Sequence, residues 1–243
     1  MPNLRTLIIG LGAAAVISSC APTGTSSSHG LDEWGHRPGP KGFTTVIIDA
    51  GHGGKDVGAV SRHTGDREKD INLDMARRIR AELGGRFKTV MVRNSDTFVD
   101  LDDRVDFANR YPGAILVSMH FNSGPSHIRG PETYFWRVDS HGLAVRCQRA
   151  MQAASPAENA NRGLVRRRLR LTRNPDIPCV LLEGGYLSNA SESRLISSSQ
   201  YRQRLAKAIA KAIDTQAAIG DVGTGPLPRP LNEPPSRPSD APE

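Results

Sequence analysis

The chain has 243 residues, of which 37% are hydrophobic and 23% are charged. These proportions exclude a wholly disordered chain and a protein embedded in the membrane. The formal net charge of +7 favours a partner that carries negative charge. Neither end of the chain has the composition of a folded domain, so one domain of ordinary size is expected over residues 44–219.

The N-terminus has the pattern of an export signal. A short apolar run from Leu7 to Val16 follows Arg5, and it is too short to cross a bilayer core of about 30 Å as a helix. The run ends in Ile17-Ser18-Ser19-Cys20, which resembles the bacterial lipobox, where the signal peptide is removed and the cysteine is acylated. We expect residues 1–19 to be a lipoprotein signal peptide. The alternative is an ordinary signal peptide followed by an incidental cysteine.

A lipid on Cys20 implies a location outside the cytoplasm. Ala21, rather than an aspartate, after the cysteine favours the periplasm, with the lipid anchored in the outer membrane. A Gram-positive cell-surface lipoprotein is the alternative. The Ser- and Gly-rich residues 20–43 predict a flexible tether, and the Pro-rich residues 220–243 predict a disordered tail.

The basic charge is concentrated in one segment of the domain. Because an exported protein rarely meets nucleic acid, we expect none as a partner and interpret the charge as suited to anionic wall polymer or lipid headgroups. A solvated basic strand edge is an equally good interpretation. The cluster consists of Arg166, Arg167, Arg168, Arg170 and Arg173.

Short apolar, β-branched runs alternate with amphipathic segments through the domain. Ile71, Met75 and Ile79, for example, recur every four residues and predict one face of a helix. This alternation predicts a single α/β domain, with a mixed, mostly parallel β-sheet flanked by helices on both faces. Strands are expected at residues 44–50, 87–93, 114–120, 133–136, 169–172 and 179–183, and helices at 69–83, 101–110, 140–154 and 198–219.

Polar groups suited to metal binding or acid–base chemistry stand at the ends of three expected strands. His52 follows the first strand, His120 ends the third and Glu183 ends the last; parallel strands bring these ends to one edge of the sheet. Glu68, just before the first helix, must return to that edge. Two imidazoles and one carboxylate are the protein ligands of a catalytic zinc, and another carboxylate serves as general base. We therefore assign His52, Glu68 and His120 to one Zn²⁺ and Glu183 to catalysis. The alternative is that the strand-end histidines only make hydrogen bonds in the core.

Eight motifs follow one another in an order that covers nearly the whole domain. They are VIIDAGHGGKDVGAV (Val46–Val60), EKDINLDMARRIRAEL (Glu68–Leu83), VMVRNSD (Val90–Asp96), LDDRVDFAN (Leu101–Asn109), ILVSMHFNS (Ile115–Ser123), GPETYFW (Gly130–Trp136), NRGLVRRRLRLTR (Asn161–Arg173) and CVLLEGGYLSNASE (Cys179–Glu192). This ordered set resembles the zinc-dependent N-acetylmuramoyl-L-alanine amidases, the group that includes the cell-division and sporulation amidases.

The resemblance implies the same site residues that the strand-end pattern indicates. The family holds its metal with the histidine of GHGG, the glutamate that opens the first helix and the histidine of S-x-H-x-N, which match His52, Glu68 and His120. The glutamate of E-x-G-[FY]-x-S-N is its catalytic carboxylate and matches Glu183. The implied reaction is hydrolysis of the amide between N-acetylmuramic acid and L-alanine in peptidoglycan. The alternatives are a zinc peptidase that acts on the stem peptide and a non-catalytic wall-binding lipoprotein.

The chain departs from the family pattern in two places. Tyr186 replaces the usual phenylalanine, which we interpret as a minor change at an apolar position. The segment from Phe121 to Arg129 is too short for the helix that blocks the site in regulated division amidases, so an open site is expected.

The remaining matched residues have structural explanations. Arg93, Arg104 and Asn109 are expected to hold loops by hydrogen bonds. Positive φ angles are expected at the glycines near the metal. The expected compartment permits a disulfide between Cys147 and Cys179, but two free buried thiols are an equally good interpretation, so a bridge is not predicted.

Overall fold

One six-stranded sheet organises the part of the chain that the structure, a computed structural model, describes: residues 38–156 and 161–228. Four strand pairs are parallel, and the β4–β6 pair is antiparallel, so β4 and β5 run opposite to the other four strands. The mixed, mostly parallel sheet expected from the sequence is confirmed. In spatial order the strands are β2 (Lys88–Met91), β1 (Thr45–Ala50), β3 (Ile115–Asn122), β6 (Cys179–Tyr186), β4 (Glu132–Phe135) and β5 (Gly163–Arg166).

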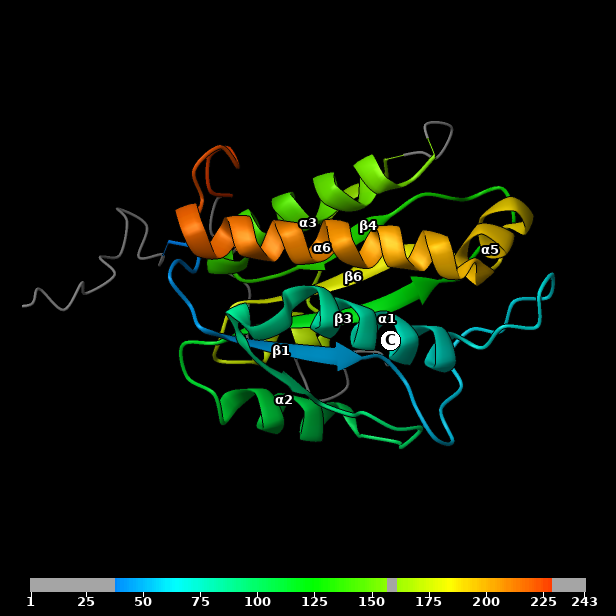
Figure 1. The fold of residues 1–243 in the computed structure, drawn as a ribbon, viewed down its shortest axis with the longest axis horizontal. Helices are drawn as coiled ribbons and strands as arrows, with labels where there is room; N and C mark the ends of the chain where they lie inside the picture. Colours follow the sequence, from blue (N-terminus) through cyan, green and yellow to red (C-terminus); the bar gives the residue numbers. More distant parts are fainter. Residues whose placement is uncertain (1–37, 157–160, 229–243) are drawn as a thin grey trace, which may run out of the picture. The chain divides into compact units, whose positions relative to one another are not determined.

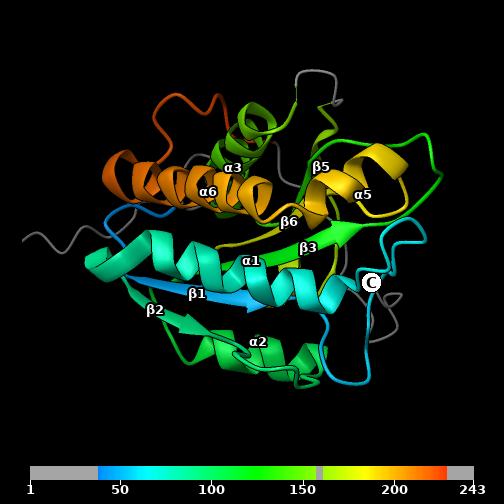
Figure 2. The same ribbon diagram turned by 45° about the vertical axis from the view of Figure 1, so that its right-hand side comes forward.

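Helices cover both faces of this sheet, as Figures 1 and 2 show. Alternate side chains of each strand point to opposite faces, so Ile48 packs in the larger apolar cluster and Ile47 in the smaller one. The helices over the larger cluster are α1 (Glu68–Leu83), α3 (His141–Ala154) and α6 (Ser199–Ile219). The helices over the smaller cluster are α2 (Leu101–Asn109) and α4 (Arg170–Arg173). The remaining helix, α5 (Ala190–Ser197), precedes α6, and two 3₁₀ turns span Gly84–Arg86 and Val138–Ser140.

The strand expected at residues 169–172 is wrong. The strand in this region is β5, which lies earlier in the chain, at Gly163–Arg166, and pairs with β4. Residues 170–173 form the short helix α4 instead. The hydroxyl of Thr172 donates to the carbonyls of Arg167 and Leu169 at 2.8 and 3.2 Å, which closes a helical turn. Leu171 is buried in the smaller apolar cluster. Leu169, two residues earlier, lines a cavity instead.

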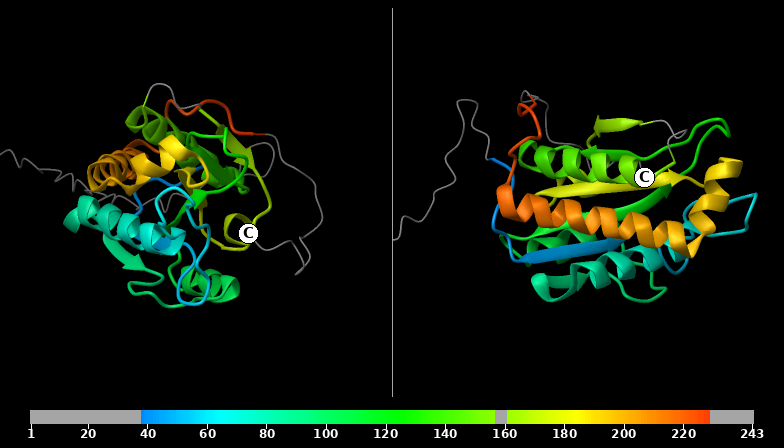
Figure 3. Two further views of the ribbon diagram at one scale, coloured as in Figure 1. Left: turned by 90° about the vertical axis from the view of Figure 1, so that its right-hand side faces the viewer. Right: turned by 45° about the horizontal axis from the view of Figure 1, so that its top comes forward.

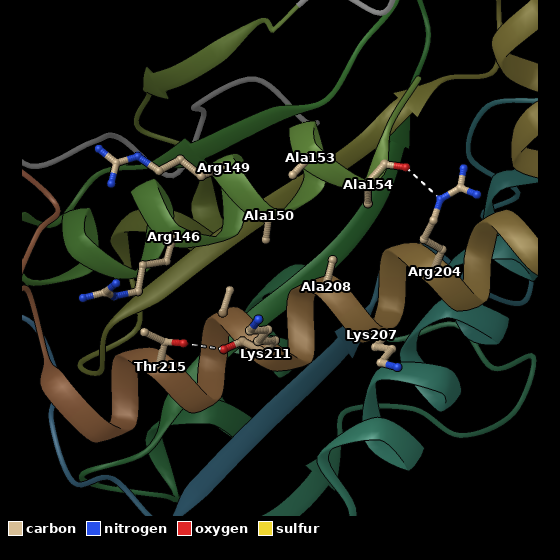
Figure 4. Close-up of a pocket in the computed structure, with 11 residues that line it drawn as sticks. Arg146, Arg149, Ala150, Ala153, Ala154, Arg204, Lys207, Ala208, Lys211 and Thr215 are labelled. Atoms are coloured by element: carbon tan, nitrogen blue, oxygen red, sulfur yellow. Dashed lines mark hydrogen bonds between the residues drawn. The ribbon is translucent and has the colours of Figure 1, made fainter. Parts of the chain in front are cut away.

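The antiparallel helices α3 and α6 pack through small residues. Arg204 near the start of α6 donates to the carbonyl of Ala154 at the end of α3. The alanines leave an open groove of about 550 Å³ between the helices, with basic side chains along its rim (Figure 4). Figure 3 (right) shows the two helices side by side over the sheet. The basic residues of the rim are Arg146, Arg149, Arg204, Lys207 and Lys211.

Both cysteines in the described residues are free and buried, the second of the two interpretations that the sequence left open. Burial raises the pKa of the Cys147 and Cys179 thiols to about 12, so neither is a nucleophile at neutral pH. Within residues 38–156 and 161–228, no helix is both long and apolar enough to span a membrane. The expected signal peptide at residues 1–19 and most of the expected tether and tail lie outside the described residues.

Candidate metal centre

The loop after β1 places His52 in an uncommon backbone conformation. His52 has a φ of 60°, a left-handed conformation that non-glycine residues adopt only where the surroundings enforce it. Arg104 donates to the carbonyls of Ala50 and His52, and Arg93 donates to those of Ala50 and Gly51. These guanidinium contacts fix the turn, which is the role expected of both arginines from the sequence.

Three of the predicted site residues come together at the carboxyl edge of the sheet. Figure 1 shows that β1 and β3 end on the side where α1 begins, and Figure 3 (left) looks onto that edge. Oε1 of Glu68 lies 3.1 Å from Nε2 of His52 and 3.0 Å from Nδ1 of His120. The ligand atoms of this trio all lie within 4.8 Å of one another.

Glu68 is buried and is held in place by its surroundings. Its carboxylate accepts hydrogen bonds from the backbone N–H groups of Ala59 and Phe121 at 2.9 and 3.2 Å and from the side chain of Asn72. Gly58, with a φ of +62°, passes so close that a Cβ there would lie 2.6 Å from both Glu68 Oε2 and His52 Cδ2. Glycine is required at this position because the missing side chain makes room for the trio.

Asp56 orients the ring of His52. Its carboxylate accepts the hydrogen bond of Nδ1 at 2.8 Å, which leaves Nε2 facing Glu68. Burial by itself would lower the pKa of His52, but Glu68 and Asp56 outweigh that effect and raise the pKa to about 9. Burial likewise opposes the ionisation of Glu68, but His120 and His52 hold its pKa well below the usual range. The trio therefore attracts positive charge, which a proton or a metal ion can supply.

The donor set fits a divalent metal of the zinc type. Nε2 of His120 is buried and has no hydrogen-bond partner within the described residues, and a buried polar atom in this state is costly in a metal-free protein. Two imidazoles and a carboxylate suit a catalytic zinc, which takes three protein ligands and leaves a position for water or substrate. The trio is thus a cluster able to bind a metal.

Glu183 lies beside the trio. Its residue pairs in register with His120 on β3 and with Glu132 on β4, so the three side chains project from the same face of the sheet. A cavity of about 540 Å³ is lined by the trio together with Glu183 and several polar residues. The predicted catalytic carboxylate and the predicted metal ligands therefore border one space. The other polar side chains that line it are Asp56, Asn122, Ser123, Tyr134 and Arg167.

Sequence reasoning missed a polar cluster on the β4 side of this cavity. The hydroxyls of Tyr134 and Tyr186 donate to Glu132 at 2.8 and 3.1 Å, and Asn122 donates to the Tyr186 hydroxyl at 3.3 Å. Burial, with Glu132 adding to it, raises the pKa of Tyr186 to about 12, so the hydroxyl stays a donor. Tyr186 is therefore more than an apolar replacement for phenylalanine. The period-two spacing of Glu132 and Tyr134 was the signal that could have revealed the cluster.

The segment between β3 and β4 contains no helix. Residues 123–131 form an irregular loop, in agreement with the expectation that this segment is too short for a blocking helix. The loop is tied to the domain because the N–H of Gly124 donates to Ser188 and the side chain of Asn189 donates to the carbonyl of Ser126.

Comparisons with known proteins agree with this geometry. The family model described as N-acetylmuramoyl-L-alanine amidase matches residues 46–215. The catalytic domain of the amidase CwlV from Bacillus (Paenibacillus) polymyxa var. colistinus is similar to this chain, with a TM-score of 0.67 and 35% identity over 71% of this chain and 97% of that domain. Protein YqiI of Bacillus subtilis is 36% identical over 70% of this chain and 84% of its own length. The amidase LytC of Bacillus subtilis is 31% identical over 68% of this chain, a match that spans 34% of LytC. The chain therefore belongs to the N-acetylmuramoyl-L-alanine amidase family.

Proposed function

We propose that this chain hydrolyses the amide bond between N-acetylmuramic acid and L-alanine in peptidoglycan, using one zinc ion per domain. Family membership supports the reaction. The donor set of His52, Glu68 and His120 supports the metal. The single observation that carries the proposal is that these three residues and Glu183 line one cavity.

The residues of the cavity divide the chemistry among them. His52, Glu68 and His120 would hold the zinc, whose chemistry there would be to polarise the scissile carbonyl and to make water more acidic. Glu183 accepts a proton from the water whose oxygen attacks the carbonyl carbon. When the C–N bond breaks, Glu183 returns that proton to the departing nitrogen. The products are the carboxyl group of the muramic acid and the free amine of the alanine, and no protein nucleophile is needed.

Muropeptide analysis tests this proposal. The mature protein, without any added partner, is expected to release intact stem peptides with a free L-alanine amine from sacculi, and a chelator is expected to stop the release. Mass spectrometry of the products measures both effects. Fragments cut within the stem peptide would instead indicate a zinc peptidase. Complete dependence on an added activator would contradict the open site inferred from residues 121–129.

We propose further that the protein is exported to the periplasm and anchored in the outer membrane by a lipid on Cys20. The lipobox-like sequence supports this, although Cys20 lies outside the described residues. The basic rim of the groove between α3 and α6 supports a second, weaker attraction to anionic wall polymer or lipid headgroups.

Replacing the acylated cysteine tests the anchor. Cys20→Ser is expected to move the protein from the membrane fraction to the soluble fraction, because the serine hydroxyl is not acylated in its place. Fractionation at low and at high salt measures the change. A variant that remains with membranes at high salt contradicts the lipid anchor. Release by salt alone assigns the attachment to the basic surface, because charges are screened over about 3 Å at 1 M salt.

A further inference from the structure

Three consecutive arginines at the end of β5 divide between two sides of one extended segment. The guanidinium groups of Arg166 and Arg168 lie over the ring of Trp136, at 5.4 and 5.5 Å from its centroid. Arg167 and Leu169 line the cavity that contains Glu183. This is the alternation that an extended backbone imposes. Of the five arginines in the basic cluster, Arg167 is the one that lines the cavity.

The backbone of Arg167 is fixed while its guanidinium is available. Its N–H donates to the carbonyl of Phe135 at 3.0 Å, and its carbonyl accepts the hydroxyl of Thr172 at 2.8 Å. The side chain is exposed, and across residues 38–156 and 161–228 its guanidinium has no hydrogen-bond or ion-pair partner. A cation is therefore held at the wall of the cavity without a carboxylate of the described residues to neutralise it.

The charges of the cavity indicate what Arg167 binds. Glu183 lines the cavity and would repel a substrate carboxylate that had no cation beside it. The N-acetylated sugar of the proposed substrate is neutral, so the negative charges near the scissile bond belong to the peptide. A planar guanidinium matches a carboxylate through two parallel hydrogen bonds. The ligand of Arg167 is therefore expected on the peptide side of the scissile amide.

The size of the cavity limits how far that carboxylate can be from the scissile bond. A volume of about 540 Å³ corresponds to a cube with edges of roughly 8 Å, and an extended peptide advances roughly 3.3–3.6 Å per residue. We propose that Arg167 recognises a free carboxylate on the second residue of the stem peptide and makes the enzyme prefer it to the amidated form. This specificity role rests on the proposed function.

Two defined substrates test the role of Arg167. They are N-acetylmuramoyl-L-alanyl-γ-D-glutamyl-L-lysine with the α-carboxyl of its glutamyl residue free or amidated. The unmodified enzyme is expected to favour the free acid by up to about fivefold in kcat/KM, mainly through KM, because an ion pair at an exposed site is worth roughly that much. Arg167→Gln is expected to bring the ratio near one with kcat and zinc content little changed, and Arg167→Lys to restore part of it.

Arg166→Gln is the matched control, because it removes the same charge one residue away on the side that faces Trp136. It is expected to keep the preference for the free acid. An unmodified enzyme without this preference, an Arg167→Gln variant that retains it, or an equal loss in Arg166→Gln would each overturn the proposal.

A binding measurement separates this proposal from the proposed function. Calorimetry of both substrates with Glu183→Gln, and with Glu183→Gln/Arg167→Gln, measures affinity without turnover. If Glu183→Gln binds the free acid more tightly than the amidated substrate and Glu183→Gln/Arg167→Gln does not, carboxylate recognition by Arg167 is supported. If Glu183→Gln binds the two substrates with equal affinity, the proposal is overturned whatever the rates of cleavage are. Failure of the unmodified enzyme to cleave either substrate would count against the amidase reaction alone.

Discussion

Glu183→Gln is expected to lower turnover by about 10²–10⁴-fold, the usual contribution of a positioned acid–base group. The amide keeps the size and shape of the carboxylate but cannot take the proton of the attacking water. Zinc is expected to remain bound, because His52, Glu68 and His120 are unchanged. Measuring the release of stem peptides beside the zinc content of the same preparation checks both parts of this expectation.

Glu132→Gln is the matched control for this experiment. Glu132 lies opposite Glu183 in register and is therefore the other carboxylate that could act as the base. It already accepts hydrogen bonds from the Tyr134 and Tyr186 hydroxyls, which make it less available to accept the proton of a water molecule. We expect its replacement to cost less than about tenfold, within the range of a positioning effect rather than of a lost base. A larger loss in Glu132→Gln than in Glu183→Gln would move the general base to β4.

The ends of the central strands could be predicted from the sequence because each is a buried apolar run followed by one polar group. His120 and Glu183 were located in this way, and the parallel direction of β3 and β6 brings them to one edge. Their direct pairing could not be predicted. It depends on β6 lying next to β3 in the sheet order, which is set by packing between segments distant in the sequence.

The β4–β5 side of the cavity was predicted less well, because the expected position of β5 in the sequence was wrong. The basic cluster was visible in the sequence, but the strand was expected at residues 169–172 instead of at Gly163–Arg166. Without the correct strand, nothing indicated that Arg167 faces the opposite side from Arg166 and Arg168. Tyr186 was misjudged because its hydroxyl partner, Glu132, is 54 residues away in the sequence. Contacts of this range follow from the fold and not from a motif.

Removing either imidazole of the trio is expected to abolish zinc binding. His52→Ala and His120→Ala each leave two protein donors, one fewer than a catalytic zinc site uses. Glu68→Gln is expected to weaken binding as well, because a neutral amide is a poor ligand and because Oε1 of Glu68 contacts both rings, at 3.0–3.1 Å. Elemental analysis of the purified proteins is expected to give about one zinc per chain for the unmodified protein and far less for these three variants.

Thermal unfolding with and without added zinc provides the second measurement. A ligand that binds only the folded protein adds about 2.7 kcal/mol of stability at one hundred times its Kd, so zinc is expected to raise the Tm of the unmodified protein. The His52→Ala and His120→Ala variants are expected to lose this shift. His63→Ala is the control, since His63 is an exposed loop residue, and it is expected to retain both the zinc and the shift. If zinc content and Tm shift stay unchanged in both trio variants, these histidines are not ligands. If Glu68→Gln keeps its zinc while Glu183→Gln loses it, the two carboxylates have exchanged roles.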